Sequence, residues 1–358
     1  YPWVEKHYGP GHEAPFQAAK VCDDYGVDVT SMVLIIVWLM GCVRQGLLTE
    51  DAIGLPVSKV GSLQFLEGLV RKISLREGFG DVLAGGVERA AEQVGPQATA
   101  LLMPLMSKAG WTNVVEGRLY PNTALMAALD PQAPLGHTHE VKQLVLRWLD
   151  WRRGVPGSYV SNEVFHRVAR RSWGSEEVAD LGNADAMARA AVRLQDRGYA
   201  HDCLIVCGFI WPVLDSQFTP DHLGDLSLEN RLLSAVTGRD IDEEGLNRVG
   251  ETVFNLGRAI LVREGHRGVE DDRLPEAWHT LPLKMDMTNP EMVLPGEGDE
   301  VVSLKGRVVD REEFARARKA YYGMRRWNQE TGRQTVARLR DLGLDDVARD
   351  LQQRGLVG

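Results

Sequence analysis

The sequence predicts a mainly α-helical protein. Apolar residues recur at intervals of three and four over long stretches, and residues that favour helix ends flank several of these stretches. Alternation of the strand type is scarce. The apolar fraction of 44% and the charged fraction of 25% are ordinary for a globular protein, and 358 residues allow about two domains.

The first strong element is the apolar run from Val29 to Val43, which includes Thr30 and Ser31. A bilayer span needs roughly 20 predominantly apolar residues, so this run is too short. We therefore expect a helix buried in a protein core and no membrane span.

Two helices are predicted in tandem after this run. Ser62 can cap the first, with Gly78 placed to end it, and Asp81 can cap the second, which Gly95 would close. Both have apolar residues on one face.

In the C-terminal half, Asp242 precedes a long amphipathic pattern that runs to Gly265. Helical patterns return at 311–327 and 345–354. Between them, residues 266–310 lose the helical period and gather prolines and glycines, as in a long surface excursion. Within it, 300–304 and 307–309 are the best candidates for a β hairpin.

The net charge of −9 would repel a phosphate backbone, which argues against nucleic acid as a partner. The four cysteines, Cys22, Cys42, Cys203 and Cys207, are too few for a disulfide framework in a chain of this length. Reduced thiols and a cytoplasmic setting are the expectation. Cys42 lies in the apolar run and is predicted to be a core residue, and Cys22 and Cys203 are expected to be structural.

Two short segments share the form Asp-x-x-(Gly or apolar)-Val-(Asp or Cys): Asp23–Asp28 and Asp202–Cys207. Taken alone, this pattern is a common turn or helix terminus. Its surroundings add specificity, because further short motifs occur around it in a fixed order. These are 21–28, 46–51, 76–87, 255–258, 263–265, 272–275, 321–322, Trp327 and 342–344.

This ordered set resembles the middle and C-terminal regions of the aldehyde:ferredoxin oxidoreductase family, more loosely between residues 100 and 198. The resemblance implies two packed helical domains like domains 2 and 3 of that family. We assign 1–108 to the first domain and 109–358 to the second.

The resemblance also implies a bis-pterin centre holding tungsten or molybdenum beside a [4Fe-4S] cluster, with each loop gripping one pterin. Carboxylates suit the task because they accept hydrogen bonds from pterin N–H groups, and a thiolate suits iron. Cys207 matches the family's last cluster ligand, although a buried structural thiol is the competing interpretation. The expected pterin-loop residues are Asp23, Gly26, Val27, Asp28, Asp202, Ile205 and Val206.

Ile205 departs from the family pattern, which has Gly at that position, and Val27 and Val206 replace Leu. Glycine tolerates positive φ and close approach where isoleucine does not, so the backbone geometry of the second loop is in question.

A catalytic histidine is also implied, and the segment Asp130–Glu140 falls where the family has one. His139 is the candidate general acid/base and His137 the substitute, since imidazole titrates near operating pH. A solvated loop with incidental histidines is the competing interpretation. His137, His139 and Glu140 could instead suggest a metal site, but no further ligands stand at recognisable spacing.

The family's other three cluster cysteines form a compact group that this sequence does not contain. We expect an N-terminal portion or a separate subunit to supply them. The leading hypothesis is an oxidoreductase part that interconverts aldehydes and carboxylic acids and passes electrons to a ferredoxin-like carrier. The alternatives are an aromatic acyl-thioester reductase subunit of the same family, or a cofactor-free helical subunit that binds partner proteins.

Overall fold

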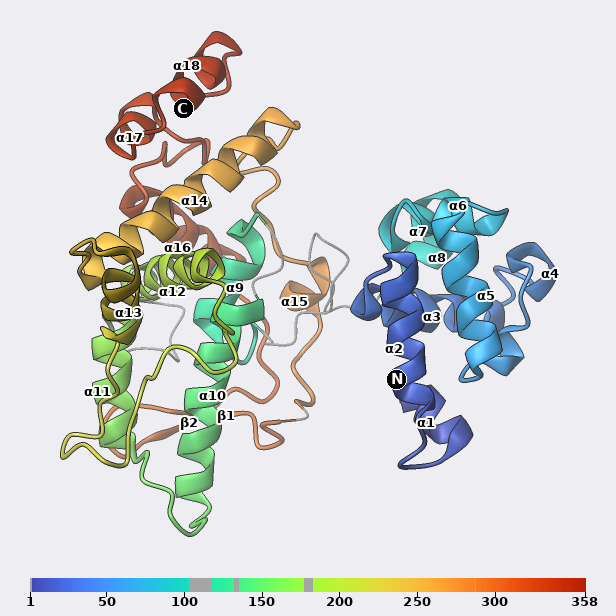
Figure 1. Cartoon of the computed structure of the whole chain (residues 1–358), viewed down its shortest axis with the longest axis horizontal. Helices are drawn as coiled ribbons and strands as arrows, with labels where there is room; N and C mark the ends of the chain where they lie inside the picture. Colours follow the sequence, from blue (N-terminus) through green and yellow to red (C-terminus); the bar gives the residue numbers. More distant parts are fainter. Residues whose placement is uncertain (1, 103–116, 132–134, 177–182, 287) are drawn as a thin grey trace. The chain divides into compact units, whose positions relative to one another are not determined.

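The computed structural model describes residues 2–102, 117–131, 135–176, 183–286 and 288–358. It divides into two compact units, Tyr1–Thr112 and Asn113–Gly358. The predicted domain boundary at residue 108 lies outside the described residues. Both units are built mostly of helices, which confirms the predicted fold class (Figure 1).

Unit 1 is a cluster of short helices around an apolar core. Helix α3 and helix α5 contribute many of the fully buried side chains, including Met32, Leu39 and Val70. The elements of unit 1 are α1 (Pro2–Tyr8), α2 (Ala14–Tyr25), α3 (Val29–Arg44), α4 (Glu50–Ile53), the 3₁₀ turn η1 (Val57–Lys59), α5 (Leu63–Ser74), α6 (Phe79–Leu83), α7 (Val87–Val94) and α8 (Pro96–Thr99).

Helix α3 is the core helix that the apolar run predicts. Trp38 is buried and donates its indole N–H to the carbonyl of Ala98 at 3.0 Å. Cys42 is fully buried, as predicted, and burial raises the pKa of its thiol to about 11. Among the described residues no single helix has the length and apolar composition to cross a bilayer. Helices α2 and α3 have this length and composition only when taken together, and the chain bends by 105° between these two helices.

The two tandem helices are only partly as predicted. Ser62 does cap α5, accepting the N–H of Phe65 at 3.1 Å, but the helix ends at Ser74 rather than at Gly78. The predicted helix capped by Asp81 is wrong: α6 begins at Phe79 and a second helix, α7, begins after Gly86. Gly86 has φ 93°, which breaks the helical path, so the apolar period continues through two helices instead of one. Gly95 ends α7 as predicted.

Unit 2 is organised around helix α12, which packs against α9, α10, α11, α14 and α16. This explains why so many α12 side chains are buried, several of them alanines. The elements of unit 2 are α9 (Pro121–Leu129), α10 (Leu135–Arg152), α11 (Asn162–Trp173), α12 (Ala184–Leu204), α13 (Leu228–Thr237), α14 (Glu243–Arg263), α15 (Glu276–Thr280), β1 (Val293–Pro295), β2 (Val301–Ser303), α16 (Arg311–Met324), α17 (Val336–Asp341) and α18 (Asp345–Gln353).

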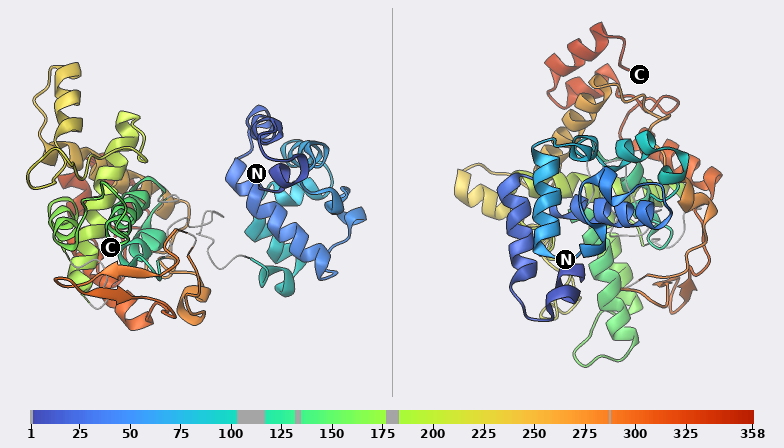
Figure 2. Two further views of the ribbon diagram at one scale, coloured as in Figure 1. Left: turned by 90° about the horizontal axis from the view of Figure 1, so that it is seen from below. Right: turned by 90° about the vertical axis from the view of Figure 1, so that its right-hand side faces the viewer.

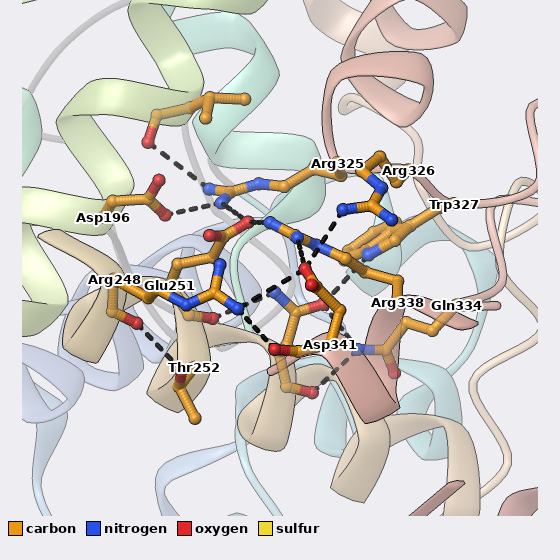
Figure 3. A network of polar contacts seen from close by, with 12 residues as sticks. Asp196, Arg248, Glu251, Thr252, Arg325, Arg326, Trp327, Gln334, Arg338 and Asp341 are labelled. Carbon is orange, nitrogen blue, oxygen red and sulfur yellow. Dashed lines mark hydrogen bonds and ion pairs between the residues drawn. The ribbon is translucent and has the colours of Figure 1, made fainter. Parts of the chain in front are cut away.

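A buried network of charges joins α12 to α14 and to the segments after α16 (Figure 3). Arg325, fully buried, donates to Asp196 of α12 at 2.5 Å and lies 3.9 Å from Glu251 of α14. Arg338 of α17 donates to the same Glu251 carboxylate. Paired charges of this kind satisfy each other in the interior, where an unpaired one would be costly. The network therefore fixes how these helices pack around α12.

Helix α14 begins and ends as predicted, with Asp242 accepting the N–H of Gly245 at 2.7 Å. The predicted hairpin within 266–310 has the wrong partner strand. Strand β2 does fall inside 300–304, but it pairs antiparallel with β1, with Leu294 opposite Val302. The stretch 307–309 has other backbone partners: the carbonyl of Arg307 accepts the N–H of Leu283 at 2.9 Å, and the N–H of Val309 donates to the carbonyl of Trp278 at 2.8 Å.

The two C-terminal helical patterns are both present. Helix α16 ends at Met324, three residues before the predicted Trp327, because Arg326 turns the chain with a φ of 58°. Helices α17 and α18 lie at the opposite end of unit 2 from the β1–β2 hairpin (Figures 1 and 2). Helix α18 packs against the C-terminal half of α14.

Candidate cofactor loops and catalytic histidine

The first predicted loop, Asp23–Asp28, joins α2 to α3. Gly26 ends α2 in the left-handed conformation, with φ 68° and ψ 33°. Its N–H donates to the carbonyl of Asp23 at 3.1 Å, and the N–H of Val27 donates to the carbonyl of Cys22 at 2.9 Å. Asp28 caps α3 by accepting the N–H of Ser31 at 2.6 Å. The loop is therefore a helix end followed at once by a helix start.

The second predicted loop, Asp202–Cys207, lies at the end of α12. Ile205 ends this helix in the left-handed conformation, with φ 57° and ψ 37°. Its N–H donates to the carbonyl of Asp202 at 3.2 Å, and the N–H of Val206 donates to the carbonyl of His201 at 3.2 Å. The left-handed residue and its two hydrogen bonds match those of the first loop. The doubt that the sequence raised about the second loop is answered at the backbone level: Ile205 adopts the conformation that Gly26 has.

The acidic side chains of the two loops are accessible. Asp23 and Asp202 are both exposed. Within the described residues the carboxylate of Asp23 makes no hydrogen bond or ion pair, and a Cβ built on Gly26 would meet no atom within 4 Å. The first loop thus offers open space and an available carboxylate, which fits a flat ring bearing N–H donors.

Cys207 stands at the start of a tight turn. Its carbonyl accepts the N–H groups of Ile210 and Trp211, both at 3.0 Å. Cys207 is exposed, and so is Cys203, whereas Cys22 is fully buried. A buried structural thiol is therefore not what the structure shows at Cys207, and the structural role expected for Cys203 does not rest on burial. An exposed thiol on a fixed turn can serve as an iron ligand.

His139 lies beside this turn. Its ring packs against that of Phe209, with 4.1 Å between the centroids, and its Nε2 is 2.8 Å from the amide nitrogen of Gln143, one turn later on α10. An amide nitrogen can only donate, so Nε2 of His139 accepts and the proton of the neutral ring is on Nδ1. Burial, together with the charge of Lys142, lowers the pKa of His139 from its ordinary value. The imidazole is thus neutral near pH 7 and able to accept a proton.

Asp130 and Glu140, at the two ends of the 130–140 segment, hold helices together. Asp130 is buried and accepts hydrogen bonds from Gln195 at 3.0 Å and from Tyr199 at 2.7 Å, both on α12. Glu140 is buried and pairs with Arg197 of α12. It is therefore not a metal ligand beside His139, and no cluster of three or more potential metal ligands occurs in the described part of the chain. His137 lies in α10, and its side chain is outside the described residues.

The end of α12 is anchored from a second side. His201 is buried, and its Nε2 lies 3.0 Å from Oε1 of Glu229 at the start of α13. Because the His201 carbonyl also accepts the Val206 N–H, this contact ties the second loop to α13.

Comparison with known proteins supplies the family. A family model described as aldehyde ferredoxin oxidoreductase, domains 2 and 3, matches residues 12–344. This chain belongs to the aldehyde ferredoxin oxidoreductase family. It is 24% identical over 334 residues to the tungsten-containing aldehyde ferredoxin oxidoreductase of Pyrococcus horikoshii, and 23% identical over 330 residues to that of Thermococcus kodakarensis.

These aldehyde ferredoxin oxidoreductases are longer than this chain. Each alignment covers 92% of this chain but only 45% of the relative. A solved structure with the same fold is the active site complex BamBC of benzoyl coenzyme A reductase in complex with 1,5-dienoyl-CoA. It has a TM-score of 0.56 and 19% identity, and the match covers 96% of this chain and 48% of that one.

Sequence reasoning did not single out Gln143 and Phe209 as neighbours of His139. The spacing of four between His139 and Gln143 on a helix was the available signal for the first contact. Nothing in the sequence indicates the second, because it joins a helix to a loop 70 residues away.

Proposed function

We propose that this chain is the part of a tungsten or molybdenum bis-pterin oxidoreductase that grips the pterins and gives the cluster its last ligand. Several helices of this chain end with the same pair of hydrogen bonds, and the observation that supports the proposal most is the exposed aspartate that begins the two loops. Two helices far apart in the sequence end in the same left-handed residue, with the same two hydrogen bonds, each beginning at an exposed aspartate.

The proposed reaction is aldehyde plus water giving carboxylic acid, two protons and two electrons, and its reverse. When bound, the bis-pterin metal would supply the two-electron exchange with the substrate, and the cluster would pass the electrons on to a ferredoxin-like carrier. The names of the relatives support the aldehyde as substrate class.

The four residues of the proposed site have separate tasks. Asp23 and Asp202 accept hydrogen bonds from pterin N–H groups, each at the end of its own helix. Cys207 binds iron as a thiolate. His139, neutral because of its lowered pKa, takes up at Nε2 the proton that leaves the reacting water or hydrate, once the hydrogen bond that Gln143 donates to this atom opens, and returns it in the reverse direction.

A second candidate function is reduction of an aromatic acyl-thioester, supported by the shared fold with the benzoyl coenzyme A reductase complex. A likeness of fold does not select a substrate, and residues outside this chain would contribute to the choice.

Cys207→Ser tests the cluster assignment. We expect the four-iron spectrum of the anaerobically assembled enzyme to be lost, because a serine hydroxyl is a poor substitute for thiolate. The assembled enzyme includes the portion that carries the other three ligands, and iron content and electron paramagnetic resonance are measured together.

Cys203→Ser is the matched control, since Cys203 is an exposed thiol four residues earlier on the same segment. It should keep the full spectrum. A normal four-iron spectrum in Cys207→Ser would overturn the assignment, and loss of the spectrum in both variants would show that the loop is merely fragile.

A further inference from the structure

Ile205 has an unfavourable backbone conformation. The described residues with positive φ other than glycine are Arg76, Ile205, His222, Met292 and Arg326, and Ile205 is the β-branched one among them. A left-handed conformation brings Cβ close to the following carbonyl, which is why glycine usually occupies it. A β-branched residue there is a genuine outlier.

Packing within the chain does not account for this conformation. The side chain of Ile205 is 93% exposed, so it contributes almost nothing to the core of unit 2. Its neighbours Phe209 and Ile210 are also exposed, by 62% and 73%. The second loop and the turn after it therefore expose three apolar side chains within a few residues of Asp202 and Cys207.

The first loop provides an internal comparison. Gly26 and Ile205 have nearly the same φ and ψ and close the same pair of hydrogen bonds, so the backbones of the two loops are equivalent. At Gly26 the space that a side chain would fill is open. At Ile205 that space holds four carbon atoms of a branched side chain. A flat ring can lie against the backbone of the first loop but not against that of the second.

We propose that Ile205 is a specificity-determining residue that makes the two loops unequal. The first loop takes a flat polar heterocycle of the pterin class against its backbone through Asp23. The second holds such a ring off its backbone and offers the Asp202 carboxylate only at the edge of an apolar surface. This inference rests on the proposed function of the loops in binding pterin.

Binding of 6-hydroxymethylpterin to the full chain tests the inference, with stoichiometry and affinity measured by quenching of pterin fluorescence. The wild-type chain should bind one equivalent tightly, which Asp23→Asn removes, and a second only weakly, through Asp202 alone. Ile205→Gly should add a second tight equivalent, at least tenfold tighter than any wild-type binding at that loop. Adding Asp202→Asn to Ile205→Gly should remove this second equivalent again.

Ile205→Gly also relieves backbone strain, so a higher melting temperature alone would not support the proposal, and stoichiometry is the deciding readout. Equal stoichiometry and affinity in the wild type and in Ile205→Gly, with binding still dependent on Asp23, would overturn the inference and leave the proposed function standing. Absence of Asp23-dependent binding in every variant would overturn the proposed function, and the inference with it.

Discussion

At His139, the environment favours one protonation state. The ring is partly buried against Phe209, and its Nε2 accepts a hydrogen bond from Gln143. Both burial and the Lys142 charge lower its pKa, so the neutral form predominates at pH 7.

Replacing His139 by Asn should therefore remove the proton acceptor while leaving the loops intact. We expect the rate of aldehyde oxidation by the assembled enzyme to fall by about 10²-fold or more, with metal and iron content unchanged. Steady-state rates and elemental analysis measure the two effects. The wild-type rate should also decline as pH drops below the lowered pKa.

His7→Asn is the control, because His7 lies exposed on α1 of unit 1. If His139→Asn retains the wild-type rate, His139 has no part in the mechanism.

Asp196 presents a second titration that affects stability rather than chemistry. Burial raises the pKa of this carboxyl to about 6 even though Arg325 opposes the shift. Its ordinary value is 3.8, so the unfolded chain releases the proton first as pH rises. The contribution of Asp196 to stability is therefore present below about pH 4 and is lost as pH rises through about 6.

We expect Asp196→Asn to remove that part of the pH dependence. Urea unfolding at several pH values between 4 and 7, compared between variant and wild type, isolates the difference from other titrating groups. The free energy of unfolding of the wild type relative to the variant should decrease across this range. A difference that is constant with pH, or that increases, would contradict the assignment.

How far the site could be predicted is clearest at single residues. The Asp-x-x-x-x-Asp and Asp-x-x-x-x-Cys spacings marked the two loops only together with the ordered motifs around them, because alone each is a common helix end. At Ile205 the sequence indicated that the second loop differs from the first, because a β-branched residue disfavours the left-handed conformation that the structure shows there. The Phe209–His139 contact depends on tertiary packing that no local pattern encodes.

Helices α12 and α14 cross closely at Gly250. A Cβ added to Gly250 of α14 would lie 1.8 Å from the carbonyl oxygen of Asp196 and 2.8 Å from the backbone nitrogen of Ala200. Neither backbone atom can move without moving α12. Gly250 therefore sets the distance between the two helices.

Gly250→Ala should lower stability even though alanine is the better helix former by about 1 kcal/mol. We expect a loss of about 1–3 kcal/mol in the free energy of unfolding, the usual cost of overpacking, measured by urea titration. Gly257→Ala on the same helix is the matched control. Its Cβ would meet only the Pro131 ring at 3.4 Å, so it should be neutral or stabilising. Equal stability of the two variants would show that α12 and α14 can separate without cost.

Element boundaries were harder to predict than elements. The apolar period predicted α3, α5 and α14 because each buries one face or its whole surface in a core. The apolar period of the predicted Asp81 helix continued through Gly85 and Gly86, where the backbone conformation separates α6 from α7. The hairpin partner was wrong because 307–309 makes its backbone hydrogen bonds with Trp278 and Leu283, distant contacts that alternation in the sequence does not indicate.

Across the whole molecule, the predicted mainly α class and the family follow from ordered local patterns, whereas the central role of α12 does not. Its composition is rich in alanine and charge, and it lacks the strong apolar face that marks a core helix in a sequence. It is central because helices distant in the sequence surround it. Its buried charges are satisfied by Arg325 and Glu140, which come from remote segments.

This placement of α12 has a measurable effect on backbone protection along a single helix. Amide protons between Ala188 and Ala200 lie beneath the surrounding helices, so they should exchange with deuterium only when unit 2 unfolds as a whole. Amides at Cys203 and Ile205, one turn further on, lie in an exposed helix end and should exchange orders of magnitude faster. Mass spectrometry of deuterated peptides would detect that gradient, and uniform labelling along α12 would contradict it. The loop proposed to grip a pterin would then be the loose end of the most slowly exchanging helix, able to adjust to a ligand while its base stays fixed.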